Sequence, residues 1–130
     1  SARCVVWTGG EPLLQLDAAL ITALHDHDFE IAVETNGTIR APAGIDWLCV
    51  SPKGRAEVVQ DSGDELKLVY PQSEPEAQPE RFAAMNFRRF SLQPLDEPAT
   101  DANTRAAIRY CMSHPRWRLS LQTHKLIGIP

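Results

Sequence analysis

The chain has 130 residues, of which 43% are hydrophobic and 23% charged, which is enough for one domain over residues 1–130 with a modest core. Its formal net charge of −4 provides no general attraction to nucleic acids or anionic membranes, and no apolar run is long enough to cross a bilayer. We therefore expect a small-molecule ligand, with no nucleic acid and no membrane among the partners.

Six short runs are rich in Val, Ile, Leu and aromatic residues and end in Gly, Pro, Ser or Asn. Such runs are typical of buried or half-buried strands. The predicted strands are 4–7, 30–35, 47–51, 66–70, 89–92 and 117–122.

Three helices are predicted between these strands, over 13–25, 76–85 and 100–113. The first follows from leucines at helical spacing, with Pro12 in the first turn, where a missing N–H is tolerated. The last is expected to start at a Thr100 or Asp101 cap. Its buried stripe is predicted at Thr104, Ala107, Ile108 and Cys111.

The alternation of strands and helices favours a parallel α/β sheet covered by helices. Six strands are too few for a closed eight-stranded barrel, so we expect an open, partial β/α barrel that lacks its first strands. In parallel architectures ligands gather at the carboxyl ends of the strands. The residues that follow each strand are therefore the candidates for a binding site.

The first strand is followed by Thr8-Gly9-Gly10-Glu11-Pro12. Two glycines let a ligand approach the backbone closely, Glu11 adds an acceptor, and a helix N-terminus follows. This arrangement suits the ammonium and carboxylate groups of an amino acid. The same residues also fit a tight strand-to-helix turn with a solvated Glu11.

The second strand ends at Glu34, whose carboxylate is placed to accept hydrogen bonds from a sugar diol. The Asn36-Gly37 pair after it is by itself a common turn. Ser51-Pro52-Lys53 follows the third strand and offers a hydroxyl and an ammonium that suit a carboxylate, although a solvated loop lysine is the alternative.

The fifth and sixth strands carry further polar residues. Gln93-Pro94-Leu95-Asp96 offers an amide and a carboxylate suited to a heterocycle and a hydroxyl group. His124 follows the last strand and is expected either to face a substrate or to make a structural hydrogen bond. Polar groups at the ends of five of the six predicted strands together predict a binding site.

Two of these motifs, residues 8–12 and Glu34-Thr35-Asn36-Gly37, each after an apolar strand, resemble the radical S-adenosylmethionine (SAM) superfamily. Ser51-Pro52-Lys53, residues 91–96 and the ending 119–130 look like the 7-carboxy-7-deazaguanine synthase family. This narrower resemblance covers nearly the whole chain.

The resemblance implies a partial barrel of the radical SAM type. It also implies conversion of 6-carboxy-5,6,7,8-tetrahydropterin to 7-carboxy-7-deazaguanine with loss of ammonia, on the route to queuosine. The family uses SAM, a 4Fe-4S cluster and Mg²⁺, and it works as a homodimer. The SAM contacts implied are Gly9, Gly10, Glu11, Glu34, Ser51, Pro52, Lys53, Gln93, Pro94, Leu95 and Asp96. The substrate contacts implied are Thr8, His124 and the terminal carboxylate of Pro130.

The cysteines depart from the family pattern. Members carry three cluster cysteines in an N-terminal loop, beside a threonine that serves Mg²⁺, and this chain has no such loop. Cys4, Cys49 and Cys111 stand far apart, which fits neither a metal site nor a disulfide framework. We expect reduced thiols used for packing, in a cytoplasmic protein. We also expect the chain to be the C-terminal portion of a longer enzyme, with no catalytic or metal-binding residue of its own, and to be inactive alone.

Two other functions remain open. A glycyl-radical-enzyme activase also uses a Gly-Gly-Glu turn, but it needs an open surface for a protein substrate, whereas the terminal Pro130 motif favours a small closed pocket. A non-catalytic module that binds SAM or a nucleotide is the second alternative, and the missing cluster cysteines favour it for the chain as it stands.

Overall fold

A computed structural model describes residues 3–96 and 99–120. Within them, six strands form one sheet in the order of the sequence, and every neighbouring pair runs parallel. The predicted parallel α/β architecture is therefore confirmed. The strands are β1 (Arg3–Trp7), β2 (Phe29–Thr35), β3 (Trp47–Val50), β4 (Ser62–Tyr70), β5 (Asn86–Pro94) and β6 (Trp117–Leu119).

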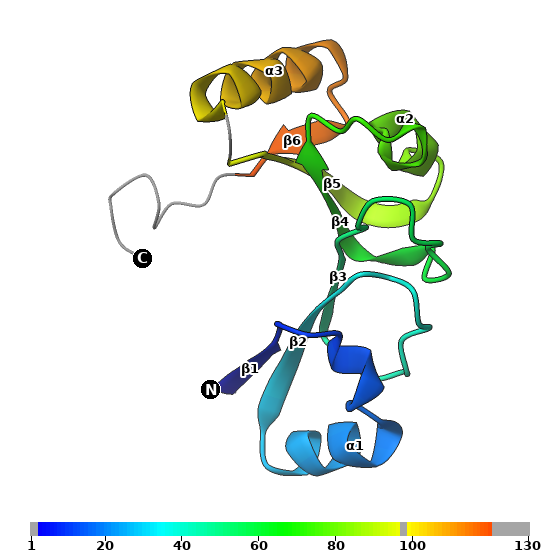
Figure 1. Ribbon diagram of the computed structural model, residues 1–130. Coiled ribbons are helices and arrows are strands. Elements are labelled where there is room, and N and C mark those ends of the chain that lie inside the picture. Colours follow the sequence, from blue (N-terminus) through cyan, green and yellow to red (C-terminus); the bar gives the residue numbers. More distant parts are fainter. Residues whose placement is uncertain (1–2, 97–98, 121–130) are drawn as a thin grey trace.

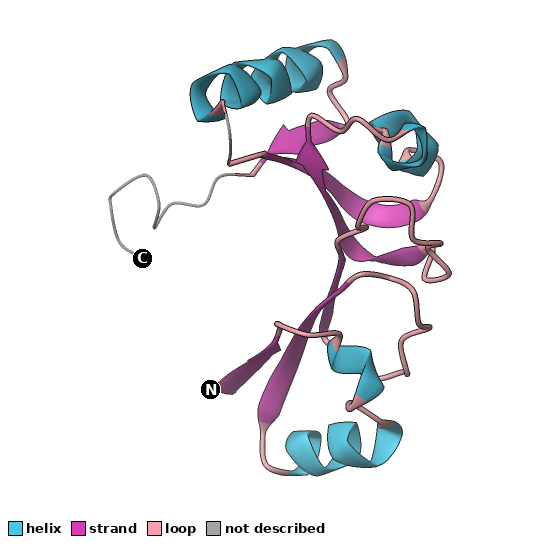
Figure 2. Cartoon of the chain, in the orientation of Figure 1, coloured by secondary structure: helices cyan, strands magenta, loops and turns pink. Residues whose placement is uncertain are grey.

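The sheet is curved, and the described helices lie along its outer, convex side (Figure 1). The concave side carries no described helix (Figure 2), as expected for part of a barrel wall. The helices are η1 (Pro12–Leu14), α1 (Ala18–Asp26), η2 (Pro75–Ala77), α2 (Pro79–Phe82) and α3 (Thr100–Ser113).

The core lies between the convex face of the sheet and the helices. Alternate strand residues supply it, and pairs such as Ile31 and Val33 or Leu66 and Leu68 are at most 2% exposed. Because successive side chains of a strand point to opposite faces, the residues between these pairs face the concave side. The concave face therefore carries polar residues such as Lys67.

The first helical segment differs from the predicted helix over 13–25. The chain forms the short helix η1 and then starts α1 at Ala18. Asp17 causes the second start, since its extended backbone and its carboxylate, which accepts from Leu20 N at 2.8 Å, cap α1. The leucine spacing indicated the apolar face but not this interruption.

The prediction of a single helix over 76–85 was wrong. Pro75 and Pro79 each begin a separate short helix, η2 and α2, and residue 78 between them has an extended backbone. This follows from the proline ring, which disfavours helical geometry in the residue before it.

Helix α3 spans the predicted residues, but its expected cap and buried stripe were partly wrong. Ala99 is the N-cap and makes no side-chain hydrogen bond, so neither Thr100 nor Asp101 caps the helix. Ala107 is fully buried as predicted, whereas Ile108 is 39% exposed. Asn103 is buried because its side-chain amide donates to the carbonyl oxygen of Leu95 at 2.9 Å.

β1 and β2 begin one residue earlier than predicted, and β4 and β5 begin well before the predicted positions, at Ser62 and Asn86. The latter two starts have weak apolar patterns, and pairing between the strands extends them: Ser62 is the parallel partner of Asn86. The last predicted strand, 117–122, ends at Leu119, and residues 121 and 122 lie outside the described part. No described helix combines the length and apolarity that crossing a membrane would require.

Candidate functional site

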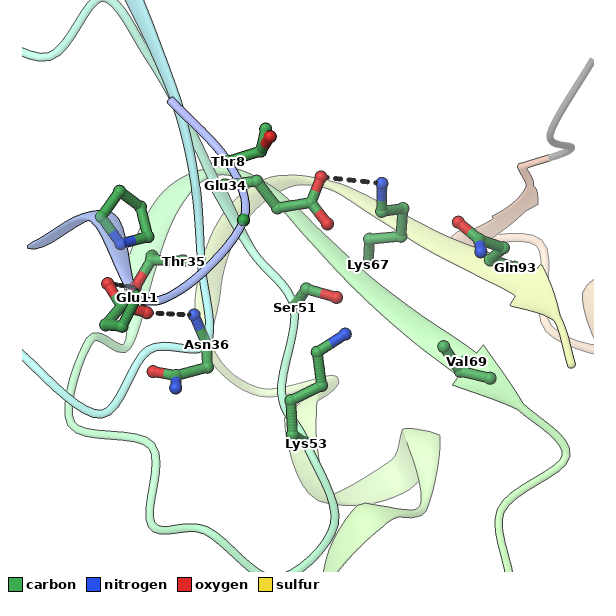
Figure 3. A pocket seen from close by; sticks show the side chains of 12 residues that line it. Thr8, Glu11, Glu34, Thr35, Asn36, Ser51, Lys53, Lys67, Val69 and Gln93 are labelled. Atoms are coloured by element: carbon green, nitrogen blue, oxygen red, sulfur yellow. Dashed lines mark hydrogen bonds and ion pairs between the residues drawn. The ribbon is translucent and has the colours of Figure 1, made fainter. Parts of the chain in front are cut away.

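A cavity of about 470 Å³ opens at the carboxyl ends of β1 to β5, the edge at which parallel sheets bind ligands (Figure 3). Seven of the predicted site residues line it, namely Thr8, Gly9, Glu11, Glu34, Ser51, Lys53 and Gln93. It is also lined by Pro12, Thr35, Asn36, Lys67 and Val69, which were not predicted as site residues.

The two glycines after β1 differ in whether the fold requires them. Gly9 has φ +95°, a conformation that L side chains rarely adopt, so the backbone itself requires glycine there. Gly10 is outside that region, and a Cβ built on it would meet nothing within 4 Å. The fold therefore does not demand glycine at position 10, and the open space beside it is available to a ligand.

Glu11 links the glycine turn to the loop after β2. Its carboxylate accepts from the backbone N–H of Leu13 at 2.9 Å, from the Thr35 hydroxyl at 2.8 Å and from Asn36 N at 2.9 Å. The Glu11 side chain thus caps η1 and holds the neighbouring loop against it. Its direct contact with a ligand stays a prediction.

Glu34 and Lys67 form an ion pair across the cavity wall. The distance from Lys67 Nζ to Glu34 Oε2 is 3.1 Å, and the two side chains are 21% and 36% exposed. Burial lowers the pKa of Lys67, but the charge and hydrogen bond of Glu34 outweigh this effect and leave the pKa above its usual value. Lys67 is therefore charged at neutral pH.

Ser51 and Lys53 occupy the loop after β3. Ser51 is 3% exposed and its backbone N–H donates to the Thr35 carbonyl at 2.7 Å, which fixes the start of the loop. Lys53 is exposed, and in Figure 3 its ammonium points toward the space beside the Ser51 hydroxyl. Pro52 is buried between them and does not line this cavity, so its contact with a ligand stays a prediction.

Of the four residues predicted as a group at the end of β5, only one lines the main cavity. Gln93 lines the main cavity, but Pro94, Leu95 and Asp96 do not. Leu95 lines another cavity, of about 390 Å³, beside Pro71 to Ser73. Gly10 likewise lines a neighbouring cavity of about 260 Å³. His124 and Pro130 lie outside the described residues.

Lys67 is the residue that sequence reasoning missed most clearly. Leu66 and Leu68 on either side of it are fully buried, and a charged residue between two core leucines must face the opposite side of the sheet. That alternation was a usable signal. The sequence prediction considered only residues that follow the strands, and Lys67 lies within β4.

The described cysteines do not fit an iron–sulfur cluster. Cys4 lies on β1, Cys49 on β3 and Cys111 on α3, and none of the described His, Cys, Asp and Glu residues form a group of three that could hold a metal ion. Burial, followed by the charge of Glu65, raises the pKa of the Cys49 thiol to about 12, so this thiol stays protonated. The packing role predicted for Cys49 agrees with its burial.

Comparison with known proteins identifies close relatives. A 7-carboxy-7-deazaguanine synthase from Caulobacter vibrioides is 67% identical over 128 residues, covering 98% of this chain and 60% of the relative. The enzyme of the same name from Bordetella pertussis is 62% identical over the same shares. The chain belongs to the 7-carboxy-7-deazaguanine synthase family. No family model matches it.

The fold agrees with this family. The crystal structure of QueE from Escherichia coli matches with a TM-score of 0.72 and 31% identity, over 94% of this chain and 57% of that one. The chain thus spans about 60% of the length of the 7-carboxy-7-deazaguanine synthases that it matches. The open sheet described above corresponds to part of the longer relatives.

Proposed function

We propose that the chain is the SAM-binding, C-terminal part of a radical SAM lyase that converts 6-carboxy-5,6,7,8-tetrahydropterin to 7-carboxy-7-deazaguanine and ammonia. The names of its relatives support the reaction. The observation that carries the role of this chain is Gly10, where the fold leaves open space without requiring glycine. A ligand that lies close against the backbone at Gly10 would explain why this position carries no side chain.

In this proposal, different residues of the site bind different parts of the ligand. The turn at Gly9, Gly10 and Glu11, in which Gly10 lines the neighbouring cavity, receives the amino group of SAM, and Ser51 with Lys53 receives its carboxylate. Glu34 accepts from the ribose. Pro52 and residues 93–96 complete the SAM contacts, and Thr8, His124 and Pro130 face the pterin.

This chain does not supply the cluster chemistry. Because its described cysteines lie on separate elements, they leave no triad to hold a 4Fe-4S cluster. We propose that the chain alone does not cleave SAM reductively. Binding and orienting SAM is the part of the reaction assigned to its residues.

Three further properties belong to the proposal through the family resemblance alone: a Mg²⁺ requirement, a homodimer and a cytoplasmic location. The free cysteines agree with a reducing compartment, since none is paired in a disulfide. Sedimentation of the purified chain measures its association state, and omission of Mg²⁺ from the assay below measures the metal requirement.

The direct test is a chimera in which this chain replaces the 128 matching residues of the Caulobacter vibrioides relative. The chimera is reconstituted anaerobically with iron and sulfide and given SAM, Mg²⁺, a reductant and the pterin. We expect 7-carboxy-7-deazaguanine by mass spectrometry, and no 5′-deoxyadenosine from the chain alone. Formation of 5′-deoxyadenosine by the chimera without that product would show that the substrate assignment is wrong.

Gly10→Ala tests the role of the glycine turn separately. Because a Cβ at this position meets nothing, we expect an unchanged melting temperature. Because the Cβ would occupy the ligand's approach, we expect SAM binding to the chimera to weaken at least about tenfold. Equal SAM affinity in Gly10→Ala and the unchanged chimera would contradict the placement of SAM.

A non-catalytic SAM-binding module is the second candidate, favoured by the separation of the described cysteines. The chimera distinguishes the two functions. A chimera that binds SAM, holds a cluster and yet forms neither product nor 5′-deoxyadenosine would favour the binding module.

A further inference from the structure

Lys67 occupies a central place on the concave face of the sheet. Its neighbours Leu66 and Leu68 are fully buried on the helix side, so the lysine side chain must extend to the opposite side. It lines both the main cavity and a smaller recess of about 130 Å³ beside it. Glu34 lines both as well, so the pair forms the boundary between the two spaces.

The ion pair leaves one carboxylate oxygen of Glu34 available. Lys67 Nζ bonds to Oε2 at 3.1 Å. In Figure 3 the other oxygen points into the cavity, toward the space above Ser51. A carboxylate held in this way has one oxygen neutralised and oriented, and the second presented as a hydrogen-bond acceptor.

The groups around Lys67 keep it charged. It faces Glu34 on β2, Cys49 on β3 and Glu65 on its own strand, and Glu65 is itself fixed by the Ser91 hydroxyl at 2.7 Å. The Cys49 thiol is neutral because burial raises its pKa to about 12. Two carboxylates therefore surround a single ammonium, and the pKa of Lys67 lies above its usual value although burial lowers it.

The second lysine of the cavity differs in this respect. Lys53 is exposed, and no ion pair to it occurs among the described residues. An anionic part of a ligand therefore has Lys53 as its partner, whereas the charge of Lys67 is already matched by Glu34. This difference separates a ligand-binding lysine from one that acts through another residue.

We propose that Lys67 is a positioning residue, which holds one carboxylate oxygen of Glu34 so that the other accepts hydrogen bonds from a neutral donor such as a ribose hydroxyl. The inference rests on the proposed function, because it takes SAM as the ligand. Lys67 determines how strongly the nucleoside part of SAM is bound without touching it.

A double-mutant cycle tests this inference, with SAM as the probe and calorimetric titration of the 130-residue chain as the measurement. We expect Lys67→Met to weaken SAM binding about tenfold, and Lys67→Arg to restore most of the affinity because it keeps a cation beside Glu34. In the Glu34→Gln background, Lys67→Met should change the affinity less than about twofold, since no carboxylate remains to be positioned.

Lys53→Met is the matched control, a lysine of the same cavity without the ion pair. Its effect should be the same size in both backgrounds. Melting temperatures show which variants are folded. If Lys67→Met does not fold, the comparison of Lys67→Arg with the unchanged chain still tests the inference. Additive effects of Lys67→Met and Glu34→Gln, or no rescue by arginine, would overturn the inference alone. If the unchanged chain binds no SAM, the proposed function fails and the inference with it.

Discussion

Gly37 combines two requirements at a single residue of the site. It follows Thr35 and Asn36 with φ +80°, and a Cβ placed on it would lie 2.7 Å from Val50 Cγ1 and 3.0 Å from Val58 Cγ1. Its carbonyl oxygen also accepts from the N–H groups of Val59 and Gln60. The loop that presents Asn36 to the cavity therefore depends on glycine for both its backbone and its packing.

Gly37→Ala should destabilise the protein by about 3 kcal/mol, the sum of left-handed backbone strain and overpacking. Gly54→Ala is the control, because Gly54 also has positive φ but its Cβ would meet nothing within 4 Å, so a loss of only about 1 kcal/mol is expected. Urea unfolding of both variants measures the difference. Equal losses would show that Val50 and Val58 move aside at no cost.

At the scale of the elements, aspartates placed beside strand ends connect neighbouring strands. Asp46, just before β3, accepts from the N–H of Ile31 in β2 at 2.7 Å, and Asp64 in β4 accepts from Leu48 N in β3 at 2.7 Å. Asp46 also bonds to His25 Nε2 at the end of α1 at 3.0 Å. These side chains fix how each strand enters the sheet.

Asp46→Asn should lower the melting temperature at pH 7 by a few degrees, because an amide is a weaker acceptor than the carboxylate. The Ile31 N–H and His25 lower the pKa of Asp46 below its usual 3.8. The stabilisation is therefore fully present above about pH 4 and is lost as pH falls through the lower folded value. Melting curves from pH 3 to 7 should converge at the acid end.

Asp61→Asn serves as the control for this pH series, since Asp61 is exposed and no hydrogen bond to its carboxylate occurs among the described residues. It should leave the melting temperature nearly unchanged throughout. A difference between Asp46→Asn and the unchanged chain that is as large at pH 3 as at pH 7 would contradict the assigned role of the carboxylate.

Local sequence patterns predicted most of the strands and helices because an element that buries one face against the core carries apolar residues at the period of its own geometry. Ile31 and Val33 alternate with Glu30, Ala32 and Glu34, and this pattern of large apolar residues at every second position indicates a half-buried strand. The interruption at Asp17 and the early start of β4 at Ser62 were not predictable in the same way. The interruption depends on whether Asp17 caps a new helix or continues the preceding one, and the sequence allows both. The early start of β4 depends on its pairing with β5.

At the scale of the whole molecule, the three cysteines lie in three different environments. Cys4 is exposed on the first strand, Cys111 is half-buried on α3, and Cys49 is buried on the concave face beside Lys67 and Glu65. Burial also raises the pKa of the Cys111 thiol. The reactivities of the thiols should therefore separate strongly in the folded chain.

We expect iodoacetamide at pH 8 to modify Cys4 first, Cys111 more slowly and Cys49 only after unfolding, because a thiol with a pKa of about 12 carries almost no thiolate at that pH. Mass spectrometry of peptides at successive times measures the order. Rapid modification of Cys49 in the folded chain would show that the concave face is more open than the structure indicates.

The sequence by itself determined the parallel α/β class and the polar residues at the strand ends, because these follow from periodicity and from the alternation of strands with helices. Only the tertiary structure decided which of those residues share one cavity. Gln93 reaches it, whereas Leu95 and Asp96 beyond the same strand do not line it. The pairing of Lys67 with Glu34 was decided in the same way, because it depends on the curvature that brings β2 and β4 together across β3.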